Sequence, residues 1–504
     1  MEIVRLQPGP AFETSTSPAF SVDKYDDDTE IIIDDDYIVD RIAERRVLRR
    51  LDLRIMPSFI LMYLFSFLAR ANIGNARILN ADSGDSLLQT LHMTDQQFLT
   101  VLAMFIVPLA LFETPSNYML KYFSAPHWFA FLLLGWGATD MIIAASRNYP
   151  TLIGLRFLLG AFEAGFFPGM IYFLTFWYRL QERAIRLSYV IAGAPLGGAF
   201  GGSIAYGVGF MNGDRGLQAW RWLFIIEGAP SCILAIIVYF FFPSYPERAA
   251  WLSSDDRLLA VRRLNQESSK SLGHARITWD GAKAALKDWR LYLHYIVFVS
   301  VSVPFSSISL FTPTIVNGLG YRGLNAQLFT VPPFAVAFLA TVAVSWVADR
   351  YRIWSMCGMV SMVLAGLTFI IHGMALVMTA LNGAEGCVSA GSLPPTSFKA
   401  RYAMLCLGTM FSYAGNPSLL AWLTGNLRDT NATTLAIPVN LAFGASGQMI
   451  GIFIYKSSEA PGYATGHFTN GAVMLVGAIG VGILRIIYKR RNRELGVGQS
   501  PWIV

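Results

Sequence analysis

Twelve apolar runs, each long enough to cross a lipid bilayer as a helix, dominate this sequence. A spanning helix needs about 20 mostly apolar residues, because the hydrocarbon core of a bilayer is about 30 Å thick. Short connections separate the runs, except for one long polar segment after the sixth. The chain is therefore predicted to be an all-α polytopic membrane protein. The helices are expected at 53–75, 96–120, 128–146, 149–174, 185–209, 220–242, 291–316, 325–348, 353–380, 401–424, 433–455 and 468–488.

The polar segment divides these runs into six and six, which predicts two pseudo-symmetric six-helix bundles. The first residues carry two runs of aspartates and no apolar period, so they are predicted to be a disordered tail. The predicted organisation is an N-terminal tail at 1–50, a first bundle at 51–242, a middle loop at 243–290, a second bundle at 291–488 and a C-terminal tail at 489–504.

Composition excludes several other classes of protein. Charged residues make up 14% of the chain, against about 25% in soluble proteins, so a soluble enzyme, a coiled coil and a disordered scaffold are excluded. No basic stripe interleaved with exposed aromatics predicts nucleic-acid binding. No Gly-rich phosphate loop and no metal-ligand spacing of His or Cys is present. We therefore expect no enzyme activity, no cofactor and no metal.

Lysine and arginine placement predicts the orientation in the membrane. Of the 39 such residues, 29 fall in the tails and in the loops on the same side as the tails, and 8 fall on the other side. Cytoplasmic loops carry an excess of positive charge, so both termini are expected in the cytoplasm.

Charges inside spanning helices are costly and are functional candidates by default. They are concentrated in the first bundle, where we expect anion attraction and proton handling, with apolar and neutral polar walls from the second bundle. These charged residues are Arg70, Glu113, Asp140, Arg156, Glu163 and Glu227.

Arg70 and Arg156 are predicted to attract a substrate carboxylate, which arginine binds with two parallel hydrogen bonds. The alternative is that each arginine neutralises a buried acid or reaches the outer interface. Glu163 lies two helical turns after Arg156 and shares its face. It is the predicted proton carrier, because desolvation favours its protonated form and a nearby arginine opposes this. A fixed structural pair is the alternative.

The remaining polar candidates are assigned weaker roles. Glu113 and Asn117 are expected to serve gating or helix packing, and Asp140 and Glu227 to lie at the membrane interface. In the second bundle, Ser306 follows a proline break, and Tyr413 and Asn416 lie at another, so these three could line a substrate cavity or make ordinary interhelix contacts. The Gly-rich run at 193–202 predicts close helix packing around a proline bend.

Several segments, in order and on the predicted helices, carry a family resemblance. They resemble the major facilitator superfamily and, more narrowly, the fungal anion:cation symporters of the allantoate permease type, over about residues 50 to 490. The segments are Asn72–Ala76, Glu113–Asn117, Arg156–Gly160, Glu163–Gly169, Trp220–Gly228, Pro332–Pro333, Ala460–Tyr463 and Gly466–His467.

This resemblance implies twelve helices around one central cavity that opens alternately to each side. It also implies small organic anions as substrates, such as allantoate, nicotinate, pantothenate or biotin, usually moved with protons, and a cavity lined by helices 1, 4, 7 and 10. Two positions depart from the family. Ala69 stands where the family usually has an aspartate, which removes one proton site. The superfamily also has a signature of acidic and basic residues in the loop after helix 2, and here it is degenerate. Its counterpart after helix 8 survives as Asp349 and Arg350, with an expected gating role.

The sequence therefore predicts a secondary active transporter of a small carboxylate by alternating access, with proton-coupled import. One alternative is an exporter of a secondary metabolite, by proton antiport or facilitated diffusion. An alternative of another class is a non-transporting membrane sensor, against which the short middle loop and tails argue. The expected partners are the anionic substrate, protons and the lipid bilayer, and we expect a monomer in the plasma membrane.

Overall fold

The computed structural model describes residues 41–265, 283, 287–321, 323–382, 395–427, 430–460, 462–495 and 502–504, and these residues form helices and short connections without strands. The helices are α1 (Arg41–Ile78), α2 (Leu87–Thr90), α3 (Asp95–Tyr122), α4 (Ala125–Ile143), α5 (Tyr149–Glu163), α6 (Phe166–Leu174), α7 (Leu180–Gly209), α8 (Ala219–Phe241), α9 (Ser254–Asn265), α12 (Trp289–Gly318), α13 (Leu324–Leu328), α14 (Val331–Tyr351), α15 (Trp354–Asn382), α16 (Pro395–Ala414), α17 (Asn416–Gly425), α18 (Thr430–Phe453) and α19 (Ala464–Glu494).

The predicted all-α membrane fold is confirmed. Ten helical segments of the described chain are long and apolar enough to cross a bilayer. The other two predicted positions are also helical, as α4 and as the successive helices α16 and α17. Three predicted helices are each split in two, giving the pairs α5 and α6, α13 and α14, and α16 and α17.

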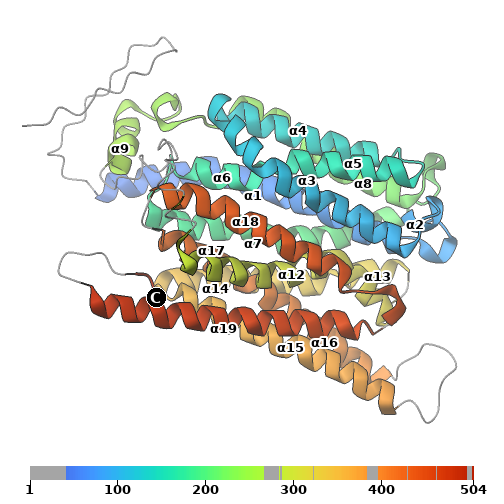
Figure 1. Ribbon diagram of the computed structural model, residues 1–504. Helices are drawn as coiled ribbons and strands as arrows, with labels where there is room; N and C mark the ends of the chain where they lie inside the picture. The colour runs from blue at the N-terminus through green and yellow to red at the C-terminus, as the bar shows by residue number, and fades with distance from the viewer. Residues whose placement is uncertain are drawn as a thin grey trace, which may run out of the picture. The chain divides into compact units, whose positions relative to one another are not determined.

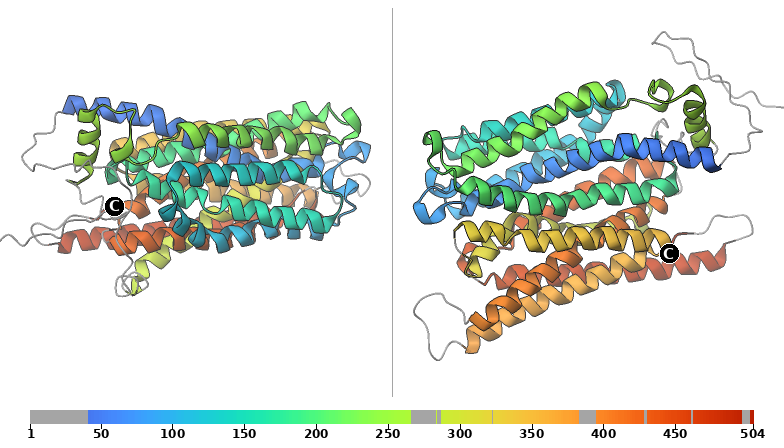
Figure 2. Two further views of the ribbon diagram at one scale, coloured as in Figure 1. Left: turned by 90° about the horizontal axis from the view of Figure 1, so that it is seen from above. Right: turned by 180° about the vertical axis from the view of Figure 1, so that it is seen from behind.

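The helices pack as two sets, which we call the first half (α1 to α8) and the second half (α12 to α19). In the first half α4 packs on α8, α1 on α7, and α3 on α5. In the second half α12 packs on α18, α15 on α19, and α14 on α16. Figures 1 and 2 show the two sets side by side, with α4, α5 and α8 far from the boundary between them and α15, α16 and α19 on the opposite side.

Close backbone contacts join the two halves. A Cβ added at Gly74 of α1 would lie 2.3 Å from the carbonyl oxygen of Leu310 in α12. A Cβ at Gly202 of α7 would lie 2.1 Å from Oγ1 of Thr330, just before α14. The other side of the glycine run faces α1, where Gly197 lies against Leu64. The glycine run therefore allows close helix packing, as the sequence predicted. One side of it packs on α1, and the other side packs on the second half and forms part of the junction between the halves.

Helix α1 begins at Arg41, before the predicted membrane segment, so the basic stretch that precedes this segment is helical too. Charged pairs join this extension to the segment that follows the fourth spanning helix and to the start of α7, and Arg50 pairs with Asp256 of α9. Arg179 binds Glu44 at 2.8 Å, and Arg186 of α7 binds both carboxylate oxygens of Asp52, at 2.6 and 2.8 Å. The described part of the middle loop also contains α9, which packs on α1. The predicted disordered residues 1–40 lie outside the described part of the chain.

Candidate functional site

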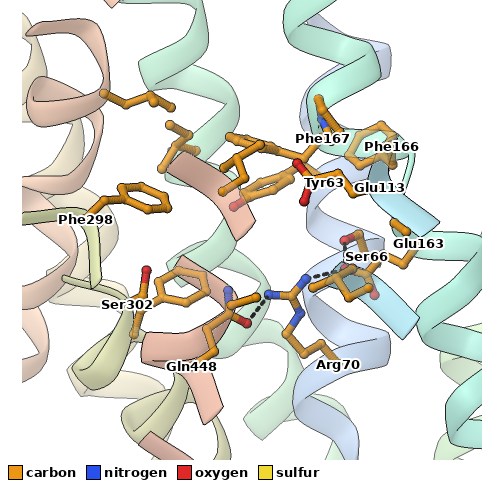
Figure 3. A pocket seen from close by; sticks show the side chains of 18 of the residues that line it. Tyr63, Ser66, Arg70, Glu113, Glu163, Phe166, Phe167, Phe298, Ser302 and Gln448 are labelled. Atoms are coloured by element: carbon orange, nitrogen blue, oxygen red, sulfur yellow. Dashed lines mark hydrogen bonds and ion pairs between the residues drawn. The ribbon is translucent and has the colours of Figure 1, made fainter. Parts of the chain in front are cut away.

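A pocket lies between the two halves, with about 800 Å³ of empty space when its part open to solvent is included. Its walls come from α1, α3, α5, α6 and α7 on one side and from α12, α17 and α18 on the other. Figure 3 shows Arg70 in this pocket, between Glu163 and Gln448. The lining residues are Tyr63, Ser66, Arg70, Leu109, Glu113, Glu163, Ala164, Phe166, Phe167, Pro168, Ile191, Phe298, Ser302, Phe305, Asn416, Leu420, Leu441, Ala445 and Gln448.

Two interrupted helices meet at the pocket. The fourth spanning helix breaks between α5 and α6, and the tenth breaks between α16 and α17, where Pro417 occupies the first turn. A proline removes one backbone donor and clashes with the preceding turn, which favours a break or a kink at this point of the helix. In transporters built from repeated halves, broken helices at corresponding positions mark the binding site. Here both breaks contribute to the lining, through Ala164 and Asn416.

Arg70 and Glu163 form the ion pair at the centre of the pocket. Nη2 of Arg70 donates to Oε1 of Glu163 at 2.6 Å, and the Ser66 hydroxyl donates to the same oxygen, also at 2.6 Å. The Glu163 side chain is 3% exposed and that of Arg70 is 16% exposed. Oε2 of Glu163 and Nε of Arg70 have no hydrogen-bond partner among the described residues. The pair therefore keeps capacity for a further polar group.

Gln448 is a pocket residue that sequence reasoning missed. Its Oε1 accepts a hydrogen bond from Nη1 of Arg70 at 3.3 Å, so the second half contacts the arginine of the first. Gln448 lies on α18, the eleventh spanning helix, which the family resemblance does not place in the cavity. A lone glutamine inside the apolar run at 433–455 was the available signal.

Arg156, a predicted substrate-binding residue, lies outside the pocket lining. It is 1% exposed, and Asp140 and Glu163 both act on it electrostatically. The small residue on its face, Gly160, packs against the backbone of α3, because a Cβ there would lie 2.3 Å from the carbonyl oxygen of Phe105.

Asp140 and Glu227 were expected near the outer ends of their helices, at the membrane interface, and the structure shows that neither is exposed. Both are buried inside the first half, with 0% and 3% of the residue exposed. Backbone contact between α4 and α8 explains the burial, since a Cβ at Gly228 would lie 2.8 Å from the carbonyl oxygen of Gly137. These two acids therefore share the interior with Arg156.

Of the three residues predicted to line a cavity in the second half, one lies in the pocket and two lie outside its lining. Asn416 lines the pocket, whereas Ser306 and Tyr413 do not. Ser306 is buried against α18. A Cβ added at Gly451 of α18 would lie 3.2 Å from the Cβ of Ser306. The Tyr413 hydroxyl donates to the carbonyl oxygen of Phe305 at 3.4 Å, and its ring packs edge-on against Phe67 of α1. Tyr413 therefore belongs to an aromatic contact between the halves, next to the pocket.

The predicted gating residues lie in different places. Glu113 is buried in the pocket wall, and its Oε1 has no hydrogen-bond partner in the described chain. Asn117 is one turn further along α3, facing Gly169 of α6. Asp349 is half-buried near the end of α14 and interacts electrostatically with Arg186 of the first half, while the neighbouring Arg350 is exposed.

This arrangement suits the binding of an anion. A guanidinium held by one carboxylate can exchange that partner for another carboxylate of the same geometry. The uncharged polar groups of Tyr63, Ser302 and Asn416 stand on the pocket walls, where they can orient hydroxyl or carbonyl groups. Apolar side chains of phenylalanine, leucine, isoleucine, alanine and proline supply most of the remaining surface.

Comparisons with known proteins agree on one family. The model of the Major Facilitator Superfamily matches residues 56–452. The chain is 45% identical over 454 residues to the MFS transporter prlL of Fungal sp. (strain NRRL 50135), covering 90% of this chain and 88% of that protein. It is 31% identical to a putative tartrate transporter of Agrobacterium vitis, covering 77% of this chain and 87% of that protein.

A solved structure shares the fold. A bacterial homologue of the human lysosomal transporter Spinster, in an inward-facing and occupied conformation, matches with a TM-score of 0.56. The match covers 87% of this chain and 96% of that chain at 13% identity, so it informs the fold alone.

Proposed function

The chain belongs to the major facilitator superfamily, and on this premise we propose that it carries a small carboxylate across the membrane together with a proton. It is a secondary transporter and not an enzyme. The observation that carries the proposal is the contact of Arg70 with Glu163 inside the pocket, at 2.6 Å.

In the proposed mechanism Glu163 and the substrate compete for the same arginine. While Glu163 is ionised, its carboxylate occupies Arg70 and the site disfavours an incoming anion. When Glu163 takes a proton it loses its charge, and Arg70 becomes free to bind the substrate carboxylate with two parallel hydrogen bonds. Proton and anion therefore bind together, as symport requires. Ala69, where the family usually has an acid, leaves this role to Glu163.

The chemistry of the pocket supports a polar, carboxylate-bearing solute. Gln448 of the second half accepts a hydrogen bond from Arg70, so an anion bound at Arg70 can change a contact between the two halves. Tyr63, Ser302 and Asn416 offer hydrogen bonds to hydroxyl or carbonyl groups of the solute. The resemblance to a putative tartrate transporter is consistent with a hydroxylated dicarboxylate, which makes tartrate the first probe.

Transport follows from alternating access of this pocket. Phe67 of α1, packed against Phe305 and Phe334 of the second half, and the close approach of Gly74 to α12 form the contacts that must separate. We propose import across the plasma membrane with both termini in the cytoplasm. The narrower assignment to anion:cation symporters of the allantoate permease type is part of this proposal.

Uptake of labelled carboxylates, with tartrate first, tests the function in yeast cells that lack their own carriers. We expect uptake to rise at acid external pH and to collapse with a protonophore. Arg70→Gln should abolish it, because glutamine carries no charge to hold the carboxylate. The control is Arg77→Gln, on the same helix two turns further along, where the arginine pairs with the half-exposed Asp95.

Two results would contradict the proposal. Normal uptake by Arg70→Gln would remove the anion site. Absence of uptake by surface-expressed wild type, together with efflux of a loaded carboxylate, would replace import with export.

A further inference from the structure

A second group of charges lies in the first half, outside the pocket. Among the described residues, the membrane part of this half contains four carboxyl side chains and two guanidinium side chains. Arg70 and Glu163 pair with each other, and Glu113 lines the pocket. The three that remain are Asp140 of α4, Arg156 of α5 and Glu227 of α8, which we call the buried cluster.

The buried cluster is enclosed by helices. Its members are 0%, 1% and 3% exposed in chain order. Asp140 acts electrostatically on both Arg156 and Glu227. The carboxyl oxygens of Asp140 and the Nε and Nη2 atoms of Arg156 have no hydrogen-bond partner in the part of the chain that is described. From α1, the fully buried amide of Asn72 faces Glu227.

The charges of the buried cluster do not balance. Two carboxylates would face one guanidinium and leave a net negative charge away from water. An uncompensated buried charge is strongly unfavourable, and a carboxyl avoids this cost by binding a proton. We propose that the buried cluster is a proton-binding site, with one proton held by Asp140 and Glu227 and the remaining carboxylate neutralised by Arg156.

Charged and titratable groups next to the buried cluster influence how tightly it holds its proton. From α5, Glu163 acts on Arg156 and on Asp140. From α8, the Cys232 thiol interacts with Asp140. The side chain that α1 contributes is the neutral Asn72. Arg156 therefore interacts both with Asp140 of the buried cluster and with Glu163, the carboxylate that holds Arg70.

This placement couples the buried cluster to the pocket, a step that rests on the proposed function. When Glu163 loses its negative charge, Arg156 loses one of its anionic neighbours. The positive potential at the buried cluster then rises, which favours release of its proton. Proton binding at Glu163 and proton binding at the buried cluster therefore oppose each other, so a proton that reaches the pocket carboxyl favours release of the proton held in the interior.

Infrared spectroscopy of the purified full chain in lipid nanodiscs tests the site without any substrate. The measured quantity is the carbonyl stretch of protonated carboxyl groups at neutral pH. Asp140→Asn and Glu227→Gln should each remove the signal of one protonated carboxyl, because one carboxylate then balances Arg156. Arg156→Gln should add one, since both acids then require a proton, so the contribution of the buried cluster doubles.

Asp95→Asn is the matched control, because this half-exposed carboxylate pairs with Arg77 and should carry no proton. Spectra of both acid variants identical to wild type, or no gain in Arg156→Gln, would overturn the proton site. The opposite signs of the acid and arginine variants keep the test informative if one variant does not fold.

The coupling has its own test. In Glu163→Gln, the pH at which the buried-cluster signal disappears should fall, because the negative charge next to Arg156 is gone. An unchanged midpoint would overturn the coupling. Because these spectra need no solute, failure of carboxylate uptake and failure of the proton site are separate results.

Discussion

Glu163→Gln separates binding from coupling more sharply than any other single change. The substitution keeps the size of the side chain but removes the carboxylate that accepts hydrogen bonds from Arg70 and Ser66. In the proposed mechanism this carboxylate competes with the substrate for Arg70. Its removal should therefore strengthen substrate binding at neutral pH while it abolishes proton-driven accumulation.

The expected size follows from the geometry. A hydrogen bond between charged groups contributes about 1.5–3 kcal/mol net. The Arg70 side chain is 16% exposed, and screening by solvent argues for the lower end. A difference of about 1.4 kcal/mol corresponds to a tenfold change in affinity. We therefore expect the Kd for the carboxylate at about pH 7.5 to fall roughly tenfold in Glu163→Gln, and to lose its pH dependence.

Two assays on purified protein measure both parts. Equilibrium binding of the labelled carboxylate gives the Kd at acid and neutral pH, and proteoliposomes with an imposed pH gradient give accumulation. Ser66→Ala is the matched control, because it removes one neutral hydrogen bond to the same oxygen and leaves the charge in place. An unchanged Kd together with gradient-driven accumulation in Glu163→Gln would refute competition for Arg70 as the coupling step.

Other contacts give further expectations. Gly74→Ala places a Cβ 2.3 Å from the carbonyl oxygen of Leu310, so the two halves must separate there; overpacking of this kind costs about 1–3 kcal/mol and should lower the melting temperature of the purified protein. Asp349→Asn removes an attraction to Arg186, which is also held by Asp52, and should raise hydrogen exchange at the start of α7 by a few-fold at most. Asn426→Ala removes two hydrogen bonds, of 2.8 and 3.0 Å, to Ile503, and should speed proteolysis of this final segment without altering the Kd for substrate.

Much of the fold could be read from the sequence because the bilayer imposes a strong length rule. A segment that spans hydrocarbon must satisfy its backbone internally, so long apolar runs become helices. The order of the helices follows from the sequence for the same reason. The break in the tenth span lies at Pro417, as the sequence indicated, whereas α12 runs unbroken through the expected break at Pro304. The helix positions of Arg70, Glu163 and Asn416 were also readable, because charged and polar residues in apolar runs are conspicuous.

The partners of these residues were not readable. Spacing along one helix placed Glu163 on the face of Arg156, too far along the helix for a direct pair, and could not show that its hydrogen-bonded partner is Arg70 on another helix. Gln448 was overlooked, and Tyr413 points into an aromatic contact instead of the pocket. In a membrane protein both the lipid-facing and the protein-facing sides of a helix are apolar, so periodicity does not tell which side faces a neighbour.

The sequence by itself therefore determined that this chain is a helical membrane protein of two halves, with the charges in the middle of its spans concentrated in the first. Only the tertiary structure decided which charges meet. Arg70 meets Glu163 in the pocket, whereas Asp140 and Glu227 gather with Arg156 away from it. The physical reason is that helix rotation and close approach at glycines such as Gly137 and Gly228 depend on packing between distant segments. No spacing within one helix encodes that contact.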